Sequence, residues 1–321
     1  MLVESAHPRA GIDYPGTWQA FESWFPDEES CRRFLTGVRW PDGFVCRRCA
    51  TSDAWLTGRG LWMCRACGTQ TSLTAGTIFD RSRYPLRTWF SAMWFVCSQK
   101  NGVSALGLQR VLGFGSYETA WAWLHKLRRA MVRPDREPLG GEGVSVEIDQ
   151  TFIGGRSQGK RGAHYDNKSE VVIAVERQHP KGLGRARLRQ IDTTDRKNEL
   201  FRFVQETIAH GTIVYTDGDK LYTDIMRKLQ FHHERIVLLH TTQPAHQLLP
   251  AVHRVAALLK RWLSGTLHDG YNTENLGYYL DEFTFRFNRR NSRSRGLLWY
   301  RLLQQAAHTD PHPLDQLQHK M

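Results

Sequence analysis

The sequence predicts an α/β protein whose second half folds as a mixed sheet covered by helices. Three strand-like segments come first: V-S-V-E-I-D-Q-T-F-I, S-E-V-V-I-A-V-E and A-R-L-R-Q-I-D. Helices and strands then alternate, as a helix over 195–209, a strand T-I-V-Y-T-D that ends at Asp217, a helix over 220–229, a strand R-I-V-L-L, and two helices near 250–263 and 273–287. The order βββαβαβα is that of a ribonuclease H-like domain.

A small metal module precedes this domain. Its four cysteines, Cys46, Cys49, Cys64 and Cys67, form two C-x-x-C pairs with fourteen residues between them, which is the spacing of a zinc ribbon. Each pair makes a tight turn, and two such turns bring four sulfurs to the corners of a tetrahedron that suits Zn²⁺. We expect one structural zinc ion. The alternatives are two disulfides or four free buried thiols, but nothing in the chain is typical of a secreted protein.

Two helical regions flank the ribbon. Residues 14–38 carry aromatic and apolar side chains at helical spacing, and Pro26-Asp27-Glu28-Glu29 is typical of a helix start. Over 81–133, an apolar helix is followed by S-A-L-G-L-Q-R-V-L-G, a short break, and a helix that Ser116 caps. Two short helices around a glycine-containing turn predict a helix-turn-helix, with an ordinary helical hairpin as the alternative.

The chain is basic and its charge is clustered. It has 44 Lys and Arg against 32 Asp and Glu, a net charge of +12, which favours nucleic acid as the partner. Residues 81–133 hold nine Lys or Arg and one acid, and residues 286–301 hold six Arg and no acid. We therefore expect DNA contacts from both segments. The residues predicted to make them are Lys126, Arg128, Arg129, Arg289 and Arg290.

Other features favour a reducing cytoplasm. No stretch of 18 apolar residues could span a membrane, and the N-terminus lacks the basic start and apolar core of a signal peptide. Cys31 and Cys97 lie outside the C-x-x-C pairs and are expected to be buried thiols.

Two carboxylates lie on predicted strands of the second half. Asp149 is inside the first strand, where an ionised group is costly unless it is paired or bound to a metal, and Asp217 ends a later strand. Functional groups collect at strand ends in α/β sheets. Two such carboxylates and a third ligand from a later helix could hold two Mg²⁺ ions about 4 Å apart for phosphodiester chemistry. The alternative is a salt-bridged strand residue and an unrelated turn residue.

Six motifs spread from about residue 20 to residue 306 carry a resemblance to a known family: R-W-P-D-G-F with C-x-x-C, T-A-W-A-W-L-H-K-L-R, V-E-I-D-Q-T-F-I-G-G, Y-T-D-G, L-L-K-R-W-L-S-G-T and Y-L-D-E-F-T-F-R-F-N-R-R. The chain resembles bacterial insertion-sequence transposases of the DDE superfamily, in the zinc-ribbon family numbered fifteen ninety-five. The resemblance implies that Asp149 and Asp217 bind the catalytic metal and that Lys260 holds a phosphate of the transposon end. It also implies cleavage at the ends of the element and attack of the 3′-hydroxyl on target DNA.

The third metal ligand departs from the superfamily pattern, which usually has Glu or Asn. Alignment on Lys260, which the family places seven positions after the ligand, puts His253 there, 36 residues after Asp217. Both positions lie on one helix face. Because an imidazole nitrogen is a softer donor than a carboxylate, we expect Mn²⁺ to support activity better, relative to Mg²⁺, than in an all-carboxylate site. The alternatives are a solvent-facing His253, or Glu274 or Glu282 as the ligand.

The predicted organisation is an N-terminal helical segment at 14–40, the zinc ribbon at 41–78, the helix-turn-helix at 81–133, a linker at 134–143, the ribonuclease H-like catalytic domain at 144–306 and a tail at 307–321. Gly154-Gly155 and the following loop S-Q-G-K-R-G-A-H are expected either to contact DNA or to be solvated.

The predicted function is a DNA transposase with structural Zn²⁺ and catalytic Mg²⁺ or Mn²⁺. Its expected partners are the double-stranded DNA of terminal inverted repeats and of the target, and further copies of the chain in the active complex. One alternative is a catalytically inactive DNA-binding protein derived from a transposase. The other is a nuclease that only hydrolyses and leaves no joined product.

Overall fold

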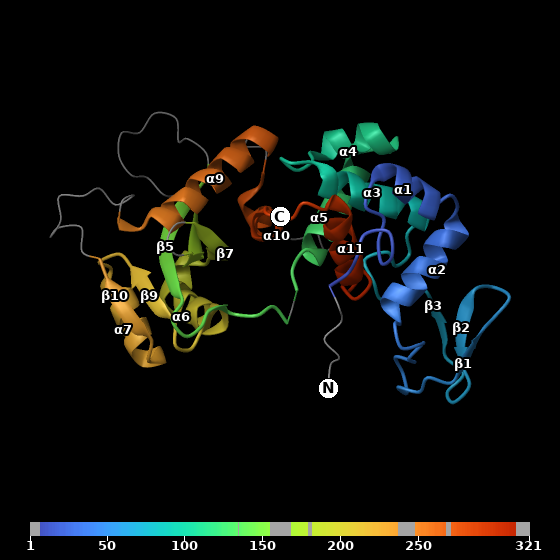
Figure 1. The fold of residues 1–321 in the computed structure, drawn as a ribbon, viewed down its shortest axis with the longest axis horizontal. Helices are drawn as coiled ribbons and strands as arrows, with labels where there is room; N and C mark the ends of the chain where they lie inside the picture. Colours follow the sequence, from blue (N-terminus) through green and yellow to red (C-terminus); the bar gives the residue numbers. More distant parts are fainter. Residues whose placement is uncertain are drawn as a thin grey trace. The chain divides into compact units, whose positions relative to one another are not determined.

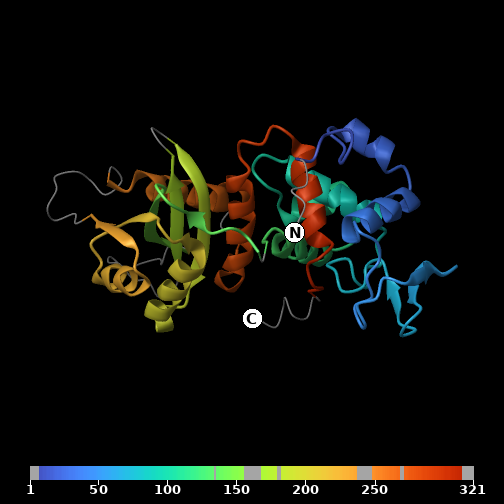
Figure 2. The same ribbon diagram turned by 60° about the horizontal axis from the view of Figure 1, so that its bottom comes forward.

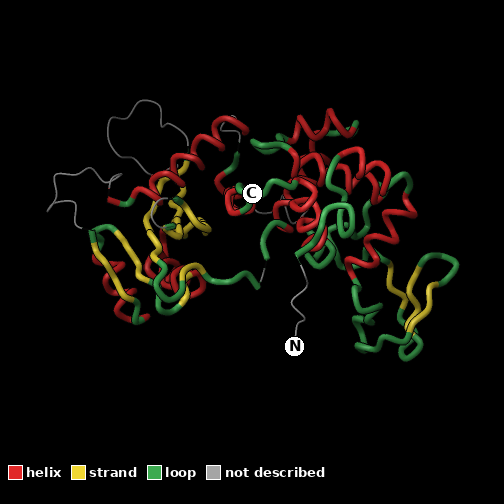
Figure 3. Tube along the Cα trace, viewed as in Figure 1, coloured by secondary structure: helices red, strands yellow, loops and turns green. Residues whose placement is uncertain are grey.

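The computed structural model describes residues 7–133, 135–154, 168–178, 182–236, 248–267 and 271–312. The chain forms two compact units, Met1–Arg133 with Asn291–Met321, and Pro134–Arg290 (Figures 1 and 3). The first unit is mostly helical and carries a small three-stranded sheet, whereas the second is built on a five-stranded sheet. In the described ranges, no helix is long and apolar enough to cross a membrane.

The first unit follows the predicted order of helices, ribbon and helical pair. Its elements are α1 (Trp18–Trp24), α2 (Glu28–Arg39), β1 (Ala54–Leu56), β2 (Leu61–Cys64), β3 (Gln70–Ser72), α3 (Leu86–Ser98), α4 (Ala105–Leu112), α5 (Tyr117–Ala130) and α11 (Arg295–Ala306). The predicted helix start is confirmed, because the Asp27 carboxylate caps α2 by accepting from Ser30 N–H at 2.8 Å. Ser116 caps α5 in the same way, through the N–H of Thr119.

The last helix packs in the first unit. Trp299 of α11 is fully buried, and its indole N–H donates to the carbonyl of Phe90 in α3 at 3.1 Å. Its ring centroid lies 5.7 Å from that of Phe21 and 5.5 Å from that of Phe25. The α/β unit therefore ends at Arg290, whereas the sequence predicted its end at residue 306. The difference arises because the apolar face of α11 packs in the aromatic core of the first unit.

The second unit is the predicted α/β domain. Its elements are β4 (Leu139–Gly140), β5 (Ser145–Ile153), β6 (Ser169–Arg177), β7 (Leu183–Ile191), η1 (Thr193–Asp195), α6 (Arg196–Thr207), β8 (Ile208–Ala209), β9 (Ile213–Thr216), α7 (Lys220–Leu229), β10 (His232–Arg235), α9 (Pro250–Leu267), η3 (Thr273–Asn275) and α10 (Leu276–Asn288). The sheet order is β10-β9-β5-β6-β7, with β10, β9 and β5 parallel and the remaining pairs antiparallel. This mixed sheet confirms the ribonuclease H-like fold class. β10 begins three residues before the predicted strand R-I-V-L-L.

Helices cover both faces of this sheet (Figure 2). On one face, α9 and α10 pack against Val171, Ile173 and Val175 of β6, and on the other α6 and α7 pack against Val172 and Ala174. Successive strand residues point to opposite faces, which explains why β6 is a continuous apolar run in the sequence. By the same alternation, the odd-numbered residues of β5 face α9.

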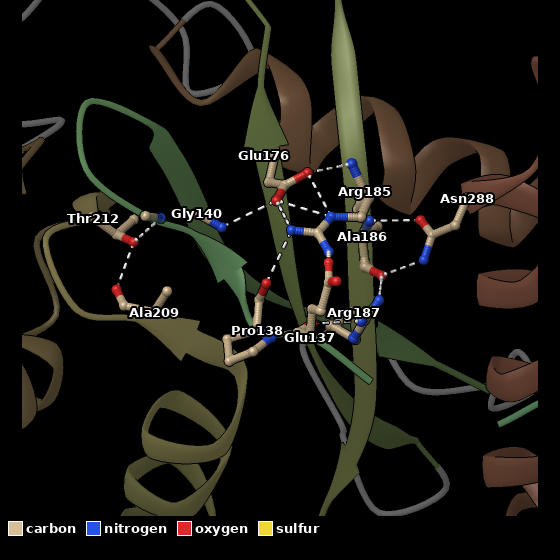
Figure 4. A network of polar contacts seen from close by, with 11 residues as sticks. Glu137, Pro138, Gly140, Glu176, Arg185, Ala186, Arg187, Ala209, Thr212 and Asn288 are labelled. Atoms are coloured by element: carbon tan, nitrogen blue, oxygen red, sulfur yellow. Dashed lines mark hydrogen bonds and ion pairs between the residues drawn. The ribbon is translucent and has the colours of Figure 1, made fainter. Parts of the chain in front are cut away.

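The segment predicted to be a linker, 134–143, belongs to the second unit. Leu139 is fully buried, and β4 pairs with β8. Figure 4 shows how the segment is held. The Glu176 carboxylate accepts from Gly140 N–H at 3.0 Å and from the backbone and guanidinium of Arg185, which in turn donates to the carbonyl of Pro138 at 2.9 Å. These charge-assisted hydrogen bonds fix the segment against β6 and β7.

Candidate metal centres and nucleic-acid contacts

Four sulfurs converge in the ribbon. The Sγ atoms of Cys46, Cys49, Cys64 and Cys67 all lie within 4.8 Å of one another, with 3.6 Å between Cys46 and Cys67 and 3.5 Å between Cys49 and Cys64. Zn–S bonds of about 2.3 Å place tetrahedral sulfurs about 3.8 Å apart, so the four residues fit a zinc ion. None of the four is in a disulfide. Hydrogen bonding with Thr69 lowers the pKa of Cys67 to about 6. Despite a hydrogen bond from Thr51, contact with Cys67 and burial raise the pKa of Cys49 to about 12, so the metal-free cluster keeps protons on part of its thiols.

The two C-x-x-C turns have the same backbone design. In the first, the N–H of Ala50 donates to the carbonyl of Cys46 at 2.8 Å, and in the second the N–H of Gly68 donates to that of Cys64 at 3.0 Å. Ala50 and Gly68 are equivalent positions and both are left-handed, with φ of 58° and 68°. Glycine adopts this conformation without strain, whereas Ala50 is held in it by the turn.

The two predicted catalytic aspartates occupy adjacent positions in the second unit. β5 and β9 are parallel with Ile148 opposite Thr216, so Asp149 and Asp217 follow side by side. The Asp149 carboxylate is 16% exposed, and it accepts from the N–H of Gln150 at 2.7 Å. Burial, together with the negative charge of Asp217, raises the pKa of Asp149 to about 6 despite that hydrogen bond. Two carboxylates that repel each other in a half-closed site suit a divalent cation.

His253 lies beside Asp149 of this pair. It lies in the first turn of α9, and its Nε2 is 3.9 Å from Oδ2 of Asp149. The His253 side chain is 35% exposed, so a bound cation or DNA phosphate has access to it. A neutral imidazole nitrogen and two carboxylates are a donor set that fits Mg²⁺ or Mn²⁺.

Glu147 fixes the start of α9, a role that the sequence analysis missed. Its carboxylate is fully buried, and Oε2 accepts from the backbone N–H groups of Ala251 at 2.8 Å and Val252 at 2.9 Å. The Nε atom of Arg177 lies 3.4 Å from Oε1. The first N–H groups of a helix have no partners within the helix, so a carboxylate acceptor suits this position. Burial nevertheless raises the pKa of Glu147, against the effect of these hydrogen bonds and of Arg177. Glu147 thereby holds the helical turn that carries His253.

The signal for Glu147 was present in the sequence. It precedes Asp149 by two residues in an alternating strand, so both side chains point to the same face of the sheet. The sequence also predicts a helix near 250–263, but it does not predict that the first turn of this helix lies over that face.

Gln150 and Tyr222 border the aspartate pair on the other side of β5. The amide of Gln150 donates to the Tyr222 hydroxyl at 2.6 Å, and Tyr222 is fully buried in α7. Burial, and then the charges of Asp149 and Asp217, raise the pKa of Tyr222 well above its ordinary value. The hydroxyl therefore stays protonated beside the two carboxylates.

Lys260 lies on α9, two helical turns after His253, which is a rise of about 10 Å along the axis. Partial burial of its ammonium group and the neighbouring charge of Lys168 lower its pKa. Two lysines that repel each other in this way form a place where an anion is favoured.

The rival ligands are engaged elsewhere. Glu282 is buried in α10, where its Oε1 accepts from Arg286 Nε at 2.8 Å. Glu274 is exposed in η3, where its Oε2 accepts from the side-chain amide of Asn272 at 3.3 Å. These placements favour His253, whose ring reaches Asp149.

The structure changes the prediction for α5. Arg128 is only 2% exposed, so it offers no surface to DNA, and this part of the prediction is corrected. Burial of Lys126 lowers the pKa of its ammonium group, and Arg129 lies beside a histidine, with 3.0 Å between Nη1 and Nδ1 of His312. The aromatic and apolar stripe of α5 is core, as in the helical-hairpin alternative, and its exposed residues are at the first turn, around Tyr117.

The arginines at the end of α10 make structural contacts. Arg290 donates to the carbonyls of Gly184 at 3.1 Å, of Phe287 at 2.8 Å and of Leu183. Arg289 lies over the ring of Phe285, 4.1 Å from its centroid. Their DNA contacts remain predictions that would compete with this role. The predicted contact loop S-Q-G-K-R-G-A-H lies outside the described residues.

Comparisons with known proteins agree with this architecture. A family model of the ISXO2-like transposase domain matches residues 138–288, and a model of the transposase zinc-ribbon domain matches residues 26–70. A relative from Halobacterium salinarum, an uncharacterized protein in transposable element ISH50, is 24% identical over 284 residues, which cover 82% of this chain and 91% of the relative.

The fold and the two matched domains define the class as a DDE-type transposase with a zinc ribbon. The chain belongs to the insertion-sequence family numbered fifteen ninety-five. Among solved structures, the cryo-EM structure of a simian T-cell lymphotropic virus intasome in complex with PP2A regulatory subunit B56 gamma matches with 14% identity and a TM-score of 0.31. The match covers 69% of this chain and 76% of that chain.

Proposed function

We propose that this chain carries out transposition: it binds the ends of an insertion sequence, cleaves their 3′ ends and joins them to target DNA. The observation that supports this most is the pair of Asp149 and Asp217 on adjacent parallel strands, with His253 beside Asp149. The raised pKa of Asp149 means that the fold carries an electrostatic cost at this place. Such a cost is typical of a site built to bind something, here a cation.

Asp149, Asp217 and His253 would hold the catalytic Mg²⁺ or Mn²⁺. The bound cations would supply activation of the attacking oxygen and stabilisation of the leaving one. The chain has to provide an ionised Asp149, which requires a pH above about 6, a condition that holds at neutral pH. His253 would bind the cation through a ring nitrogen that carries no proton.

Other residues would position the reactants. Glu147 holds the turn of α9 that carries His253, and Lys260 would bind a phosphate of the transposon end away from the reacting bond. Cys46, Cys49, Cys64 and Cys67 would hold a structural zinc ion that orders the ribbon.

The proposed partners are the double-stranded DNA of the terminal inverted repeats, the target DNA and further copies of the chain. The net charge of +12 supports a DNA partner. Joining two ends of one element needs two reacting sites, and the described residues form one aspartate pair per chain, so we propose at least a dimer in the active complex.

A joining assay tests this function. The purified chain would be incubated with labelled duplexes that carry the terminal repeats, a supercoiled target plasmid, and Mg²⁺ or Mn²⁺. We expect labelled plasmid with the wild-type chain, and none with Asp149→Asn or Asp217→Asn, although both variants still bind the ends. Asp224→Asn, an exposed carboxylate on α7 paired with Arg227, is the matched control and should join normally.

The same assay separates the two alternatives. An inactive DNA-binding protein would shift the labelled ends on a gel and produce neither nicks nor joined plasmid. A nuclease would release cut strands without labelled plasmid. Either result with the wild-type chain would contradict the proposal.

A further inference from the structure

A groove of about 460 Å³ opens in the first unit between α2 and the zinc ribbon. Arg32 and Arg33 line it from α2, and Arg59 lines it from the turn between β1 and β2. Its floor includes Trp62 of β2 and Leu56 of β1, the latter 58% exposed. This surface lies outside the two basic clusters of the sequence, at 81–133 and 286–301.

The charge of the groove favours an anion. The lining residues include three arginines and one acidic residue, Glu29. Within the described part of the chain, none of the three arginines has an acidic oxygen within 4.0 Å. Like charges gathered around one hollow raise the local positive potential, and a guanidinium matches the oxygens of a phosphate through two parallel hydrogen bonds.

The walls of the groove are rigid. Arg39 at the end of α2 is buried and donates to the carbonyls of Ser72 at 3.3 Å, Leu73, and Ala75 at 2.6 Å, which ties the helix to the segment after β3. The Trp62 ring stacks on that of Phe44, 5.2 Å away. The two sides are therefore fixed relative to each other before any ligand binds, so little ordering entropy is lost on binding.

We propose that this groove binds the sugar–phosphate backbone of double-stranded DNA without reading its sequence. The proposal rests on the proposed function for the presence of DNA, and it supplies a binding surface that the buried C-terminal half of α5 does not. The arginines are spread over two elements, as is needed to follow a backbone rather than a single phosphate. A guanidinium group can contact a phosphate or a guanine edge, so an equal effect on a terminal-repeat duplex and on a scrambled duplex is what identifies backbone contacts.

The test is the salt dependence of DNA binding by a triple variant, Arg32→Ala/Arg33→Ala/Arg59→Ala. Binding is measured by fluorescence anisotropy with a terminal-repeat duplex and with a scrambled duplex, between 50 and 200 mM salt. In a plot of the logarithm of the binding constant against the logarithm of the salt concentration, each lost phosphate contact makes the slope less steep by about 0.9. Three lost contacts make it less steep by about 2.7. Over this fourfold salt range the wild-type affinity should fall about 40-fold more than that of the variant, for both duplexes.

A second triple variant controls for charge alone. Arg65→Ala/Arg202→Ala/Arg227→Ala removes the same three charges at exposed positions that are already paired with Asp53, Glu199 and Asp224. It should keep nearly the wild-type slope. A variant with lysine at positions 32, 33 and 59 keeps the point charges and should keep most of the slope, which guards against a folding defect in the alanine variant.

Three outcomes would overturn the groove proposal: an unchanged slope in the alanine variant, the same loss in the control, or a loss confined to the terminal-repeat duplex. If the alanine variant binds DNA like the wild type while the wild-type chain joins ends, the groove proposal is wrong and the proposed transposase function is unaffected. If the wild-type chain binds no DNA at 50 mM salt, both fail.

Discussion

Replacing Asp149 by asparagine should make the metal-free protein more stable at neutral pH. Burial and Asp217 raise the pKa of Asp149 from 3.8 to about 6 in the folded state. A raised carboxylate pKa stabilises the fold fully below pH 3.8, and this contribution is lost as the pH rises through about 6. This rise in the pKa of Asp149 corresponds to about 3 kcal/mol of unfolding free energy. Asparagine keeps the acceptor for the N–H of Gln150, at 2.7 Å in the wild type, and removes the charge.

Thermal unfolding followed by circular dichroism measures this effect. With the metals removed from the second unit's site, Asp149→Asn should unfold about 6–12 °C higher than wild type at pH 8, and at nearly the same temperature at pH 4. Adding Mn²⁺ should raise the wild-type midpoint and leave the variant's almost unchanged. The control is Asp224→Asn, whose carboxylate is 49% exposed and should change stability by less than about 1 kcal/mol.

The outcome that would refute this reasoning is a variant that is less stable than wild type at pH 8, or one that Mn²⁺ stabilises as much as wild type. The first would mean that the Asp149 charge is well compensated in the fold. The second would mean that Asp149 is not a ligand.

Three further predictions concern the ribbon, the helix cap and the pH profile. Cys64→Ser should reduce the zinc content from about one ion per chain to almost none by elemental analysis, and should weaken DNA binding; full zinc occupancy in the variant would contradict the ribbon site. Glu147→Gln should slow joining by about 10–100-fold with little change in DNA affinity, because the turn of α9 that carries His253 loses its charged cap; normal joining would remove the positioning role. Joining should fall as the pH drops through about 6, since Asp149, whose pKa burial raises to about 6, becomes protonated and no longer suits a metal; a rate that is flat down to pH 5 would argue against Asp149 as a ligand.

The fold class was readable from the sequence because its strongest signals are local. The β-branched runs of β5 and β6, the cap at Asp27 and the paired C-x-x-C turns each depend on a few neighbouring residues. The order of these elements then permits few arrangements, and the mixed sheet is the one observed.

Predictions that depended on long-range packing were less successful. The charge of Arg128 favours a DNA surface, but after its first turn α5 is buried or half-buried, and Arg128 itself is 2% exposed. The segment at 134–143 reads as a linker because of its glycines and prolines, although Leu139 and the Glu176–Arg185 pair fix it to the sheet. In both cases the deciding partner is distant in the sequence.

The sequence predicted one part of the candidate site, the two aspartates, and missed another, Glu147, for the same reason. Asp149 and Asp217 are at positions that strand periodicity and strand ends single out, and the parallel register of β5 and β9 brings them together. Glu147 could not be assigned, because its role depends on where α9 begins.

The most direct test of the account is the rate of joining with Mn²⁺ relative to Mg²⁺ for three chains: wild type, His253→Ala and His253→Glu. If Asp149, Asp217 and His253 form one metal site, His253→Ala should lose joining by more than about 100-fold with both ions while still binding the transposon ends. His253→Glu should restore joining and shift the preference toward Mg²⁺, because it replaces a nitrogen donor by a carboxylate. Full joining by His253→Ala, together with an inactive Glu274→Ala or Glu282→Ala, would contradict the account and move the third ligand to η3 or α10.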